Sequence, residues 1–361
     1  MPCPLGASGK PRGIWILLVC LLGLAACSPS PRIGFLGTLS GPGSELGASG
    51  RDGVQLAVED AGFELVVCDD RAHVDSAAVC MARFDSLSIG VVVGPMTSNV
   101  ASRVAEEAAR REIIVISPTV SAAALSGRDD FFVKLMPENA MQAELLARHL
   151  VEKRSRSVSI LFSQSNAAYA EPLARRVAEH LVQDGVRVAL LEGYADGMKL
   201  HFEPWIARME DSSAVVVIGS SMDLGVFLKE RERSGKTLRV HAAQWGMGED
   251  LLRVAGSAAD GLVLPGMPEQ VSDSRGIQDL RRRFRERFAH TPSFGAVFGW
   301  EAAQVALRLV SAPPGRESLR AMLRDTSFAP LGWRLGLDSL GDAKRMPLLC
   351  RVRNGRFEES R

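Results

Sequence analysis

Two short loops rich in hydroxyl side chains carry the residues whose types and spacing best fit a binding chemistry. The loops span 94–99 and 117–121, and each follows an apolar run that is typical of a buried strand. Ligands of open α/β sheets bind at the carboxyl ends of strands. A helix beginning near Ser98 would point its free N–H groups to that edge, and the hydroxyls of Thr97 and Ser121 would add donors. The two loops therefore predict a site for a carboxylate.

The same hydroxyl residues have a structural interpretation. Serine and threonine also cap helices and form turns, so any one of them can be present for that reason alone. A third loop of similar composition, at 39–42, follows the first apolar run of the chain. This recurrence after successive runs favours a shared binding edge.

The residues needed for catalysis or metal binding are not arranged in any familiar pattern. The six histidines lack the spacing of zinc sites, and no Gly-x-Ser-x-Gly elbow, phosphate-binding Walker loop or Cys-x-x-Cys pair is found. The glycines at 41–47 have one residue too many before the last glycine for a dinucleotide fingerprint. We therefore expect a protein that is not an enzyme and needs no metal or cofactor.

Short β-rich runs alternate with amphipathic helical stretches along the chain, which predicts α/β architecture with parallel sheets. Nine strands are more than we expect in a single sheet, so we predict two sheets. Residues 275–310 are predicted to be helical, and an Asn-Gly turn near the end predicts a hairpin. The expected strands are 33–38, 64–68, 89–93, 113–117, 158–162, 186–191, 214–218, 238–242 and 261–264.

The 361 residues carry a formal net charge of +1, which gives no electrostatic reason to expect nucleic-acid binding. An arginine-rich stretch at 281–287 alternates with Ile277, Leu280 and Phe284 at helical spacing. We interpret it as the solvated face of an amphipathic helix.

The N-terminus predicts export. A basic start precedes an apolar run at 14–26, which is shorter than the roughly 20 residues that span a membrane. The sequence Leu-Ala-Ala-Cys ending at Cys27 resembles a bacterial lipobox, with a plain signal peptide as the alternative. We expect a signal peptide at 1–26, a lipid on Cys27 and a tether at 27–32. These features place the protein in the periplasm, held at the inner or outer membrane, or at the cell surface.

Three cysteines remain in the mature chain. Cys68 and Cys80 are twelve residues apart, on a predicted strand and the helix after it. An oxidising compartment would allow them to form a disulfide, and two buried thiols are the alternative. Cys350 is expected to be buried in a late strand.

The loops described above, together with stretches at 33–47 and 292–303, resemble the branched-chain amino-acid binding proteins of ABC importers. The resemblance implies a type I periplasmic binding protein, with two Rossmann-like lobes joined by a multi-strand hinge. Lobe I would comprise 33–140 plus 270–335, and lobe II 141–269 plus 336–361. The ligand would lie between the lobes, held by Thr97, Ser98, Thr119 and Ser121 and covered by Tyr169.

The sequence departs from this family at the second lobe. Trp245 stands where an acidic residue normally binds the ligand's ammonium group, and Ser220 stands in the loop that is normally aromatic. A buried ammonium without a carboxylate is unfavourable, so we expect weak binding of ordinary α-amino acids unless Asp223 or Glu45 replaces the missing acid. Trp245 would stack on an apolar ligand or contact a cation, or would pack away from the site.

The resemblance implies a solute-binding lipoprotein that delivers a small carboxylate-bearing or amino-acid-like ligand to an ABC permease. The alternative is an envelope lipoprotein that uses the same fold to regulate or sense through protein–protein contacts.

Overall fold

A computed structural model describes residues 31–41, 43–195, 200–209, 212–313, 315–325, 329–331 and 335–360. The predicted signal peptide, Cys27 and most of the predicted tether lie outside these ranges. Within them, no helix combines the length and apolar character needed to cross a bilayer.

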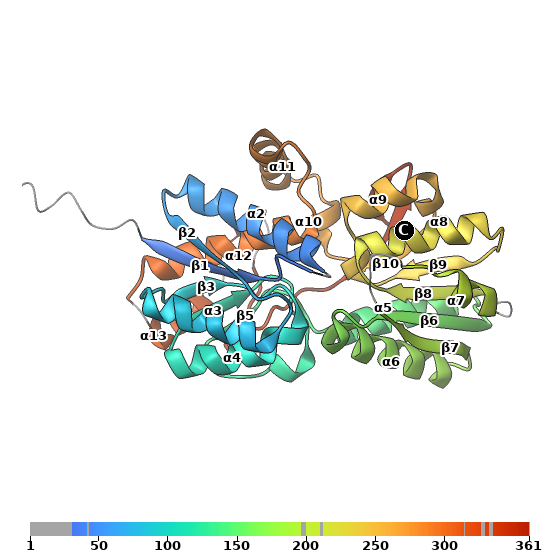
Figure 1. Ribbon diagram of the computed structural model, residues 1–361, viewed down its shortest axis with the longest axis horizontal. Coiled ribbons are helices and arrows are strands. Elements are labelled where there is room, and N and C mark those ends of the chain that lie inside the picture. The colour runs from blue at the N-terminus through green and yellow to red at the C-terminus, as the bar shows by residue number, and fades with distance from the viewer. Residues whose placement is uncertain are drawn as a thin grey trace, which may run out of the picture. The chain divides into compact units, whose positions relative to one another are not determined.

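The first sheet has five parallel strands in the order β2-β1-β3-β4-β5 (Figure 1). Its central strands are runs of buried β-branched residues, as a parallel sheet covered on both faces requires. The strands are β1 (Arg32–Gly37), β2 (Glu64–Asp69), β3 (Val91–Val93), β4 (Ile114–Ser117) and β5 (Phe132–Lys134). The helices of this part are α2 (Ser44–Asp60), α3 (Val74–Ser86), α4 (Ser98–Arg111), α12 (Phe294–Val310) and α13 (Arg316–Arg324). We call this part lobe I.

Helix α12 packs closely on α2, because glycines lie where the two helices meet. A Cβ atom on Gly53 would lie 2.0 Å from the carbonyl oxygen of Ala296, and one on Gly299 would lie 2.5 Å from that of Gly50. The late helix is thereby fixed against the first helix of the chain. Helix α12 lies in the segment 275–310 that was expected to be helical, and it also contacts β1, β3 and β4.

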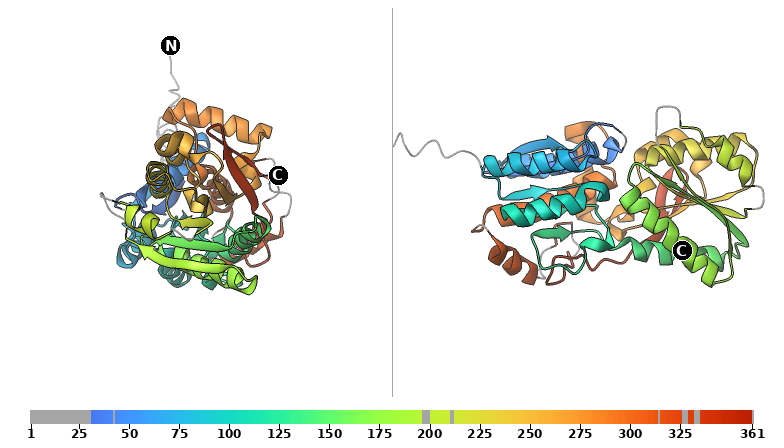
Figure 2. Two further views of the ribbon diagram at one scale, coloured as in Figure 1. Left: turned by 90° about the vertical axis from the view of Figure 1, so that its right-hand side faces the viewer. Right: turned by 60° about the horizontal axis from the view of Figure 1, so that its bottom comes forward.

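The second sheet has seven strands in the order β12-β11-β10-β9-β8-β6-β7. It is parallel from β10 to β7, and the C-terminal hairpin joins β10 in antiparallel pairing. Figure 2 shows helices on both faces of the sheets. The strands are β6 (Ser157–Ser163), β7 (Arg187–Tyr194), β8 (Ala214–Ile218), β9 (Arg239–Ala242), β10 (Val263–Gly266), β11 (Leu348–Arg353) and β12 (Arg356–Glu359). The helices are α5 (Asn139–Glu152), α6 (Ala167–Gln183), α7 (Glu203–Arg208), α8 (Ser221–Arg233) and α9 (Glu249–Ala255). We call this part lobe II.

Three segments connect the two sheets: the one between β5 and α5, the one that carries α10 (Pro268–Val271) and α11 (Arg275–Phe288), and residues 335–347 before β11. The third runs beside β5, since Lys134 forms a parallel bridge with Asp342. The predicted α/β fold with two mostly parallel sheets and several connecting segments is confirmed.

Each of the nine predicted runs overlaps an observed strand, and the C-terminal hairpin turns at the predicted Asn-Gly pair. Strand β5 was not predicted, because three residues are too few to show a pattern. The disulfide between Cys68 and Cys80 is present, with 5.7 Å between the Cα atoms, and Cys350 is fully buried in β11. Burial raises the pKa of the Cys350 thiol to about 12.

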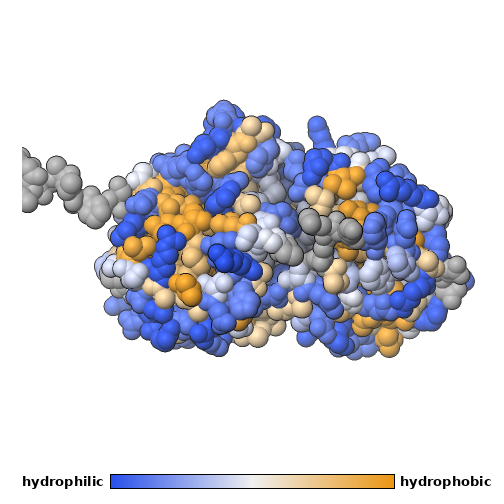
Figure 3. All heavy atoms as spheres, viewed as in Figure 1, coloured by the Kyte–Doolittle hydropathy of each residue, from blue (hydrophilic) through white to orange (hydrophobic). Residues whose placement is uncertain are grey.

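The arginine-rich stretch lies on α11 as an exposed face, with Ile277, Leu280 and Phe284 buried beneath it. Arg282 pairs with carboxylates on its own helix, and Arg287 pairs with Glu59 on α2. In the face seen in Figure 3, hydrophilic residues dominate, and apolar ones gather most extensively over lobe I.

Candidate binding site between strand ends

A small cavity lies at the carboxyl ends of strands from both sheets. Its volume is about 20 Å³, which is room for about one water molecule. No charged side chain is found among the described residues that line it. The lining residues are Leu46, Met96, Ser98, Thr119, Ser121, Met136, Gln142, Asn166, Tyr169, Gln244, Trp245 and Phe294.

The two predicted loops form the lobe I wall of this cavity. They are tied together by side chains of the second loop: the Ser117 hydroxyl donates to the Pro95 carbonyl at 2.8 Å and the Thr119 hydroxyl donates to the Met96 carbonyl at 2.6 Å. Helix α4 begins at Ser98 with Thr97 as its N-cap residue, so its first N–H groups lie at the same place. The structure thus brings the predicted loops together.

Two of the lobe I hydroxyls are buried without a protein partner. Ser121, which lines the cavity, is 1% exposed, and Thr97, which is not among the lining residues, is 5% exposed. The described residues offer no hydrogen bond to either side-chain oxygen. A buried polar atom without a partner destabilises a protein by about 1–3 kcal/mol. A ligand atom or a water molecule that met these hydroxyls would remove that penalty.

Two aromatic residues form the lobe II wall. The rings of Tyr169 and Trp245 meet edge-to-face with their centroids 6.1 Å apart. Burial raises the pKa of the Tyr169 phenol, which therefore stays neutral and donates to Gln142 Oε1 at 3.1 Å. The indole Nε1 of Trp245 and Oδ1 of Asn166 are buried with no partner among the described residues. Trp245 therefore lines the cavity instead of packing away from it.

Three glutamines that sequence reasoning missed form a hydrogen-bonded chain from lobe II to the connecting segment that carries α10. Gln142 on α5 donates to Gln244 Oε1 at 3.4 Å, and Gln244 donates to Gln270 Oε1 at 3.0 Å. Gln142 is only 2% exposed, on a buried helix face that is mostly alanine and leucine. A polar residue at an apolar helical position was the available signal for it.

Asn99 links the two lobes at the start of α4. Its Nδ2 donates to the carbonyl of Ser165 at 2.6 Å, and its Oδ1 accepts the N–H of Ala168 at 3.0 Å. Both partners belong to the segment at the start of α6. The side-chain amide thus closes lobe I on lobe II beside the cavity.

Ser220 lies outside the set of lining residues. Its hydroxyl accepts the N–H of Asp223 at 3.1 Å as the N-cap of α8, the structural role that the sequence left open. The Asp223 carboxylate accepts from the Ser220 N–H and from the Tyr194 hydroxyl. Neither Asp223 nor Glu45 lines the cavity. The described part of the cavity wall therefore contains no acid that would hold an ammonium group.

Comparison with known proteins places the chain in a family. The family model described as periplasmic binding protein matches residues 30–343. A leucine-, isoleucine-, valine-, threonine- and alanine-binding protein of Pseudomonas aeruginosa is 21% identical over 330 residues, covering 87% of each chain. A Leu/Ile/Val/Thr-binding protein of Salmonella typhimurium is 24% identical over 333 residues, covering 87% of this chain and 88% of the relative.

Solved structures share the fold at low sequence identity. The substrate-binding protein of a branched-chain amino-acid transporter from Streptococcus pneumoniae, in complex with isoleucine, has a TM-score of 0.81 at 19% identity over 91% of this chain and 98% of that one. A solute-binding protein of an ABC transporter from R. palustris, in complex with benzoate, has a TM-score of 0.80 at 18% identity. The match covers 92% of this chain and 95% of that one. The chain therefore belongs to the periplasmic binding protein family, as a type I member related to the branched-chain amino-acid binding proteins.

Proposed function

We propose that the protein is the extracytoplasmic solute-binding component of an ABC importer and captures a small carboxylate that lacks a free ammonium group. The ligand would lie between the hydroxyl loops of lobe I and the aromatic pair of lobe II. The predicted lipid on Cys27 would hold the protein at a membrane near its permease. The observation that carries the proposal is a set of buried polar atoms, in Ser121, Asn166 and Trp245, that have no hydrogen-bond partner among the described residues and line a cavity whose described wall carries no charge.

These polar atoms match the needs of a carboxylate. The Ser121 hydroxyl and the Trp245 N–H, which line the cavity, and the first N–H groups of α4 beside it are all able to donate. An anion at a helix N-terminus is further stabilised by the helix dipole. A carboxylate oxygen at this point would meet several donors at once, without any buried cation.

The rest of the wall selects against a zwitterion. An α-amino acid would bring an ammonium group into a cavity with no carboxylate, and leaving a buried charge unpaired destabilises a complex by about 3–5 kcal/mol. Met96, Met136 and Phe294 instead offer apolar contact next to the Tyr169 and Trp245 rings. An aromatic carboxylate suits this wall, and the benzoate complex of the R. palustris protein is a precedent within the same fold.

Ligand entry requires the lobes to separate. The cavity of about 20 Å³ is far below the roughly 300 Å³ at which ligand pockets begin. Motion about the three connecting segments would enlarge it, and closure on the ligand would then shift the open–closed equilibrium.

The test is calorimetry and thermal shift with benzoate and with leucine. Benzoate should bind and raise the melting temperature, and Ser121→Ala should weaken its binding about tenfold, the effect of one hydrogen bond to a charged group. Ser257→Ala, an exposed serine in the turn after α9 and outside the cavity lining, is the control and should bind like the wild type. Micromolar leucine binding, or benzoate affinity unchanged in Ser121→Ala, would contradict the proposal.

A second candidate function is protein–protein regulation or sensing in the cell envelope. One observation favours it: the protein's own side chains nearly fill the gap between the lobes. Transport of benzoate into vesicles that contain the permease and this protein would decide for the importer. Failure of every small carboxylate to bind, together with specific capture of a cell-wall enzyme, would decide for regulation.

A further inference from the structure

A second cavity, of about 290 Å³, lies in lobe II at the opposite edge of its sheet. The candidate site follows the carboxyl end of β9, whereas this cavity surrounds the amino end of the same strand. Six basic side chains are the feature that its lining residues share: His149, Lys153, Arg231, Arg239, His241 and Arg351. We call this group the basic cluster.

The strand pairing explains why a cavity forms there. Strand β10 begins at Val263. Strand β9 therefore pairs with it only at His241, which lies opposite Val263. Arg239 lies two residues before His241, on the same face of the sheet. It therefore has no strand partner in β10. On the far side of β10, Arg351 lies directly opposite Val263. The gap at this edge is thus bordered by basic residues of two strands.

The cations of the cluster are not neutralised by carboxylates. Arg239 donates to the carbonyls of Ser213 and Lys153 and to the Ser155 hydroxyl, and Arg231 donates to the carbonyl of Ala258. Within the described ranges, no ion pair is formed by Lys153 or by the three arginines. Asp260 is the one carboxylate among the residues that line the cavity.

Three nitrogen atoms of the cluster are buried and have no partner among the described residues. They are Nε of Arg231, Nε of Arg351 and Nδ1 of His241. His241 is only 3% exposed, and its ring lies 5.4 Å from that of His149. A side chain so deeply buried cannot easily turn to water, so a ligand atom that reached Nδ1 would supply a hydrogen bond that the described residues do not give it.

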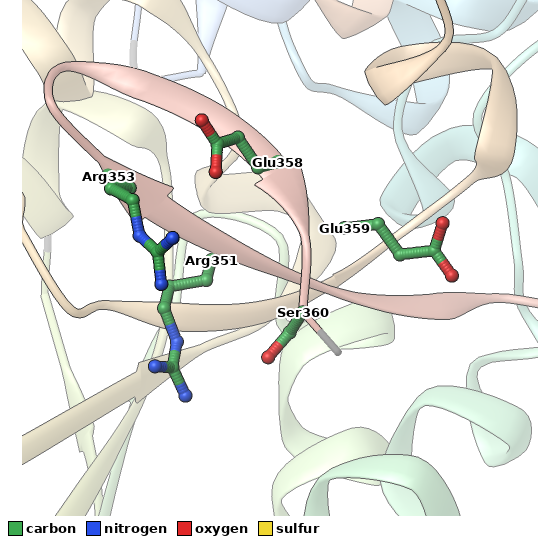
Figure 4. A pocket seen from close by; sticks show the side chains of 5 residues that line it. All are labelled: Arg351, Arg353, Glu358, Glu359 and Ser360. Carbon is green, nitrogen blue, oxygen red and sulfur yellow. The ribbon is translucent and has the colours of Figure 1, made fainter.

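The last strands bring both signs of charge near Arg351. A separate cavity there is lined by Arg351, Arg353, Glu358, Glu359 and Ser360, and Figure 4 shows the Glu359 carboxylate pointing away from the two arginines. Glu358 pairs with Arg351 across the strands, but no ion pair joins them within the described ranges.

We propose that the basic cluster binds a small oxyanion of the phosphate class. The guanidinium groups of Arg231, Arg239 and Arg351 and the Lys153 ammonium would surround it, and the His241 imidazole would contribute a hydrogen bond at the bottom. Guanidinium groups bind phosphate through paired hydrogen bonds that are stronger than neutral ones. This site is separate from the gap between the lobes and does not depend on the function proposed for that gap.

A purely structural role for the cations makes a different prediction. Lys153 and Arg231 lie at the C-terminal ends of α5 and α8, where basic side chains stabilise the helix dipole without any ligand. In that case, charge-removing substitutions would lower stability but phosphate would have no specific effect.

The test is calorimetry with inorganic phosphate, at constant ionic strength set with sodium chloride. The wild type should bind, and Arg351→Gln should weaken binding tenfold or more, since it removes charge-assisted hydrogen bonds. Arg353→Gln, two residues along the same strand and outside the cavity, is the matched control and should bind like the wild type. Absence of phosphate binding by the wild type, or equal weakening by both variants, would overturn the proposal.

A readout on the wild type alone guards against a variant that fails to fold. Phosphate should move the imidazole NMR signals of His149 and His241, and no shift of either would count against the site. A second arm distinguishes the source of the phosphate. Co-sedimentation with vesicles of equal parts phosphatidylcholine and phosphatidylglycerol, lost in Arg351→Gln, would identify a lipid headgroup. Binding of free phosphate without co-sedimentation would identify a soluble anion, and failure of both arms would refute the inference.

Discussion

Mild acid should destabilise the protein through His241. Burial first, and then the neighbouring His149 and Arg239, lowers the pKa of His241 to about 3, against about 6.5 in an unfolded chain. Below about pH 6.5 the His241 imidazole is protonated in the unfolded state, whereas in the folded state it stays neutral down to about pH 3. The stability due to neutral His241 is therefore complete above about pH 6.5 and falls as the pH drops. A pH of about 5 lies about 1.5 pH units below the pKa of the unfolded state. Each pH unit lowers the free energy of unfolding by about 1.4 kcal/mol, so the loss is about 2 kcal/mol.

Urea unfolding at neutral pH and at about pH 5 gives the free energy of unfolding at each pH. The loss is measured by comparing the change between the two pH values in the wild type and in a variant without His241. In His241→Gln, the fall in unfolding free energy between the two pH values should be about 2 kcal/mol smaller than in the wild type. Val240→Ala removes buried packing on the same strand without changing a titratable group, so it should lower stability equally at both pH values. Comparing differences cancels the other titrating groups. An identical pH dependence in His241→Gln and the wild type would refute the reasoning.

Two further predictions concern stability and closure. Replacing Cys68 and Cys80 by serine should reduce the unfolding free energy by about 3 kcal/mol in urea titrations, because the disulfide no longer restricts the unfolded chain; a thiol reductant should then have no added effect on the variant. Asn99→Ala should reduce the closed-to-open ratio by up to about 30-fold, since it removes two hydrogen bonds between the lobes worth about 1 kcal/mol each. A radius of gyration in X-ray scattering equal to that of the wild type would contradict this.

Most of the fold was predictable because its strands are buried on both faces. Runs such as 214–218 are almost entirely β-branched, so no other assignment suited them, and the observed β8 has the same bounds. The exception was β5, where three residues pair with β4 only because the chain passes that edge on its way to lobe II. Pairing of that kind depends on tertiary position and leaves no pattern in the sequence.

The candidate site was predictable only where residues follow strands. Ser121 and Trp245 lie at strand ends, and both line the cavity. Gln142 lies in the middle of a helix, and its contact with Gln244 joins residues 102 positions apart, so no local pattern pointed to the pair. Ser220 also follows a strand, but its hydroxyl caps a helix. Chain position alone could not separate a ligand hydroxyl from a capping one.

The strengths of the contacts between the lobes indicate where opening would begin. In the connecting segments Arg345 is buried between two acids, with Nη2 2.5 Å from Glu301 Oε2 and Nη1 3.5 Å from Glu269 Oε1. Breaking a buried ion pair destabilises a protein by about 3–5 kcal/mol, whereas each hydrogen bond of Asn99 contributes about 1 kcal/mol. Separation of the lobes should therefore break the Asn99 contacts and preserve the Arg345 cluster. The lobes would then separate beside the hydroxyl loops and rotate about the connecting segments. This motion would let a ligand reach Ser121.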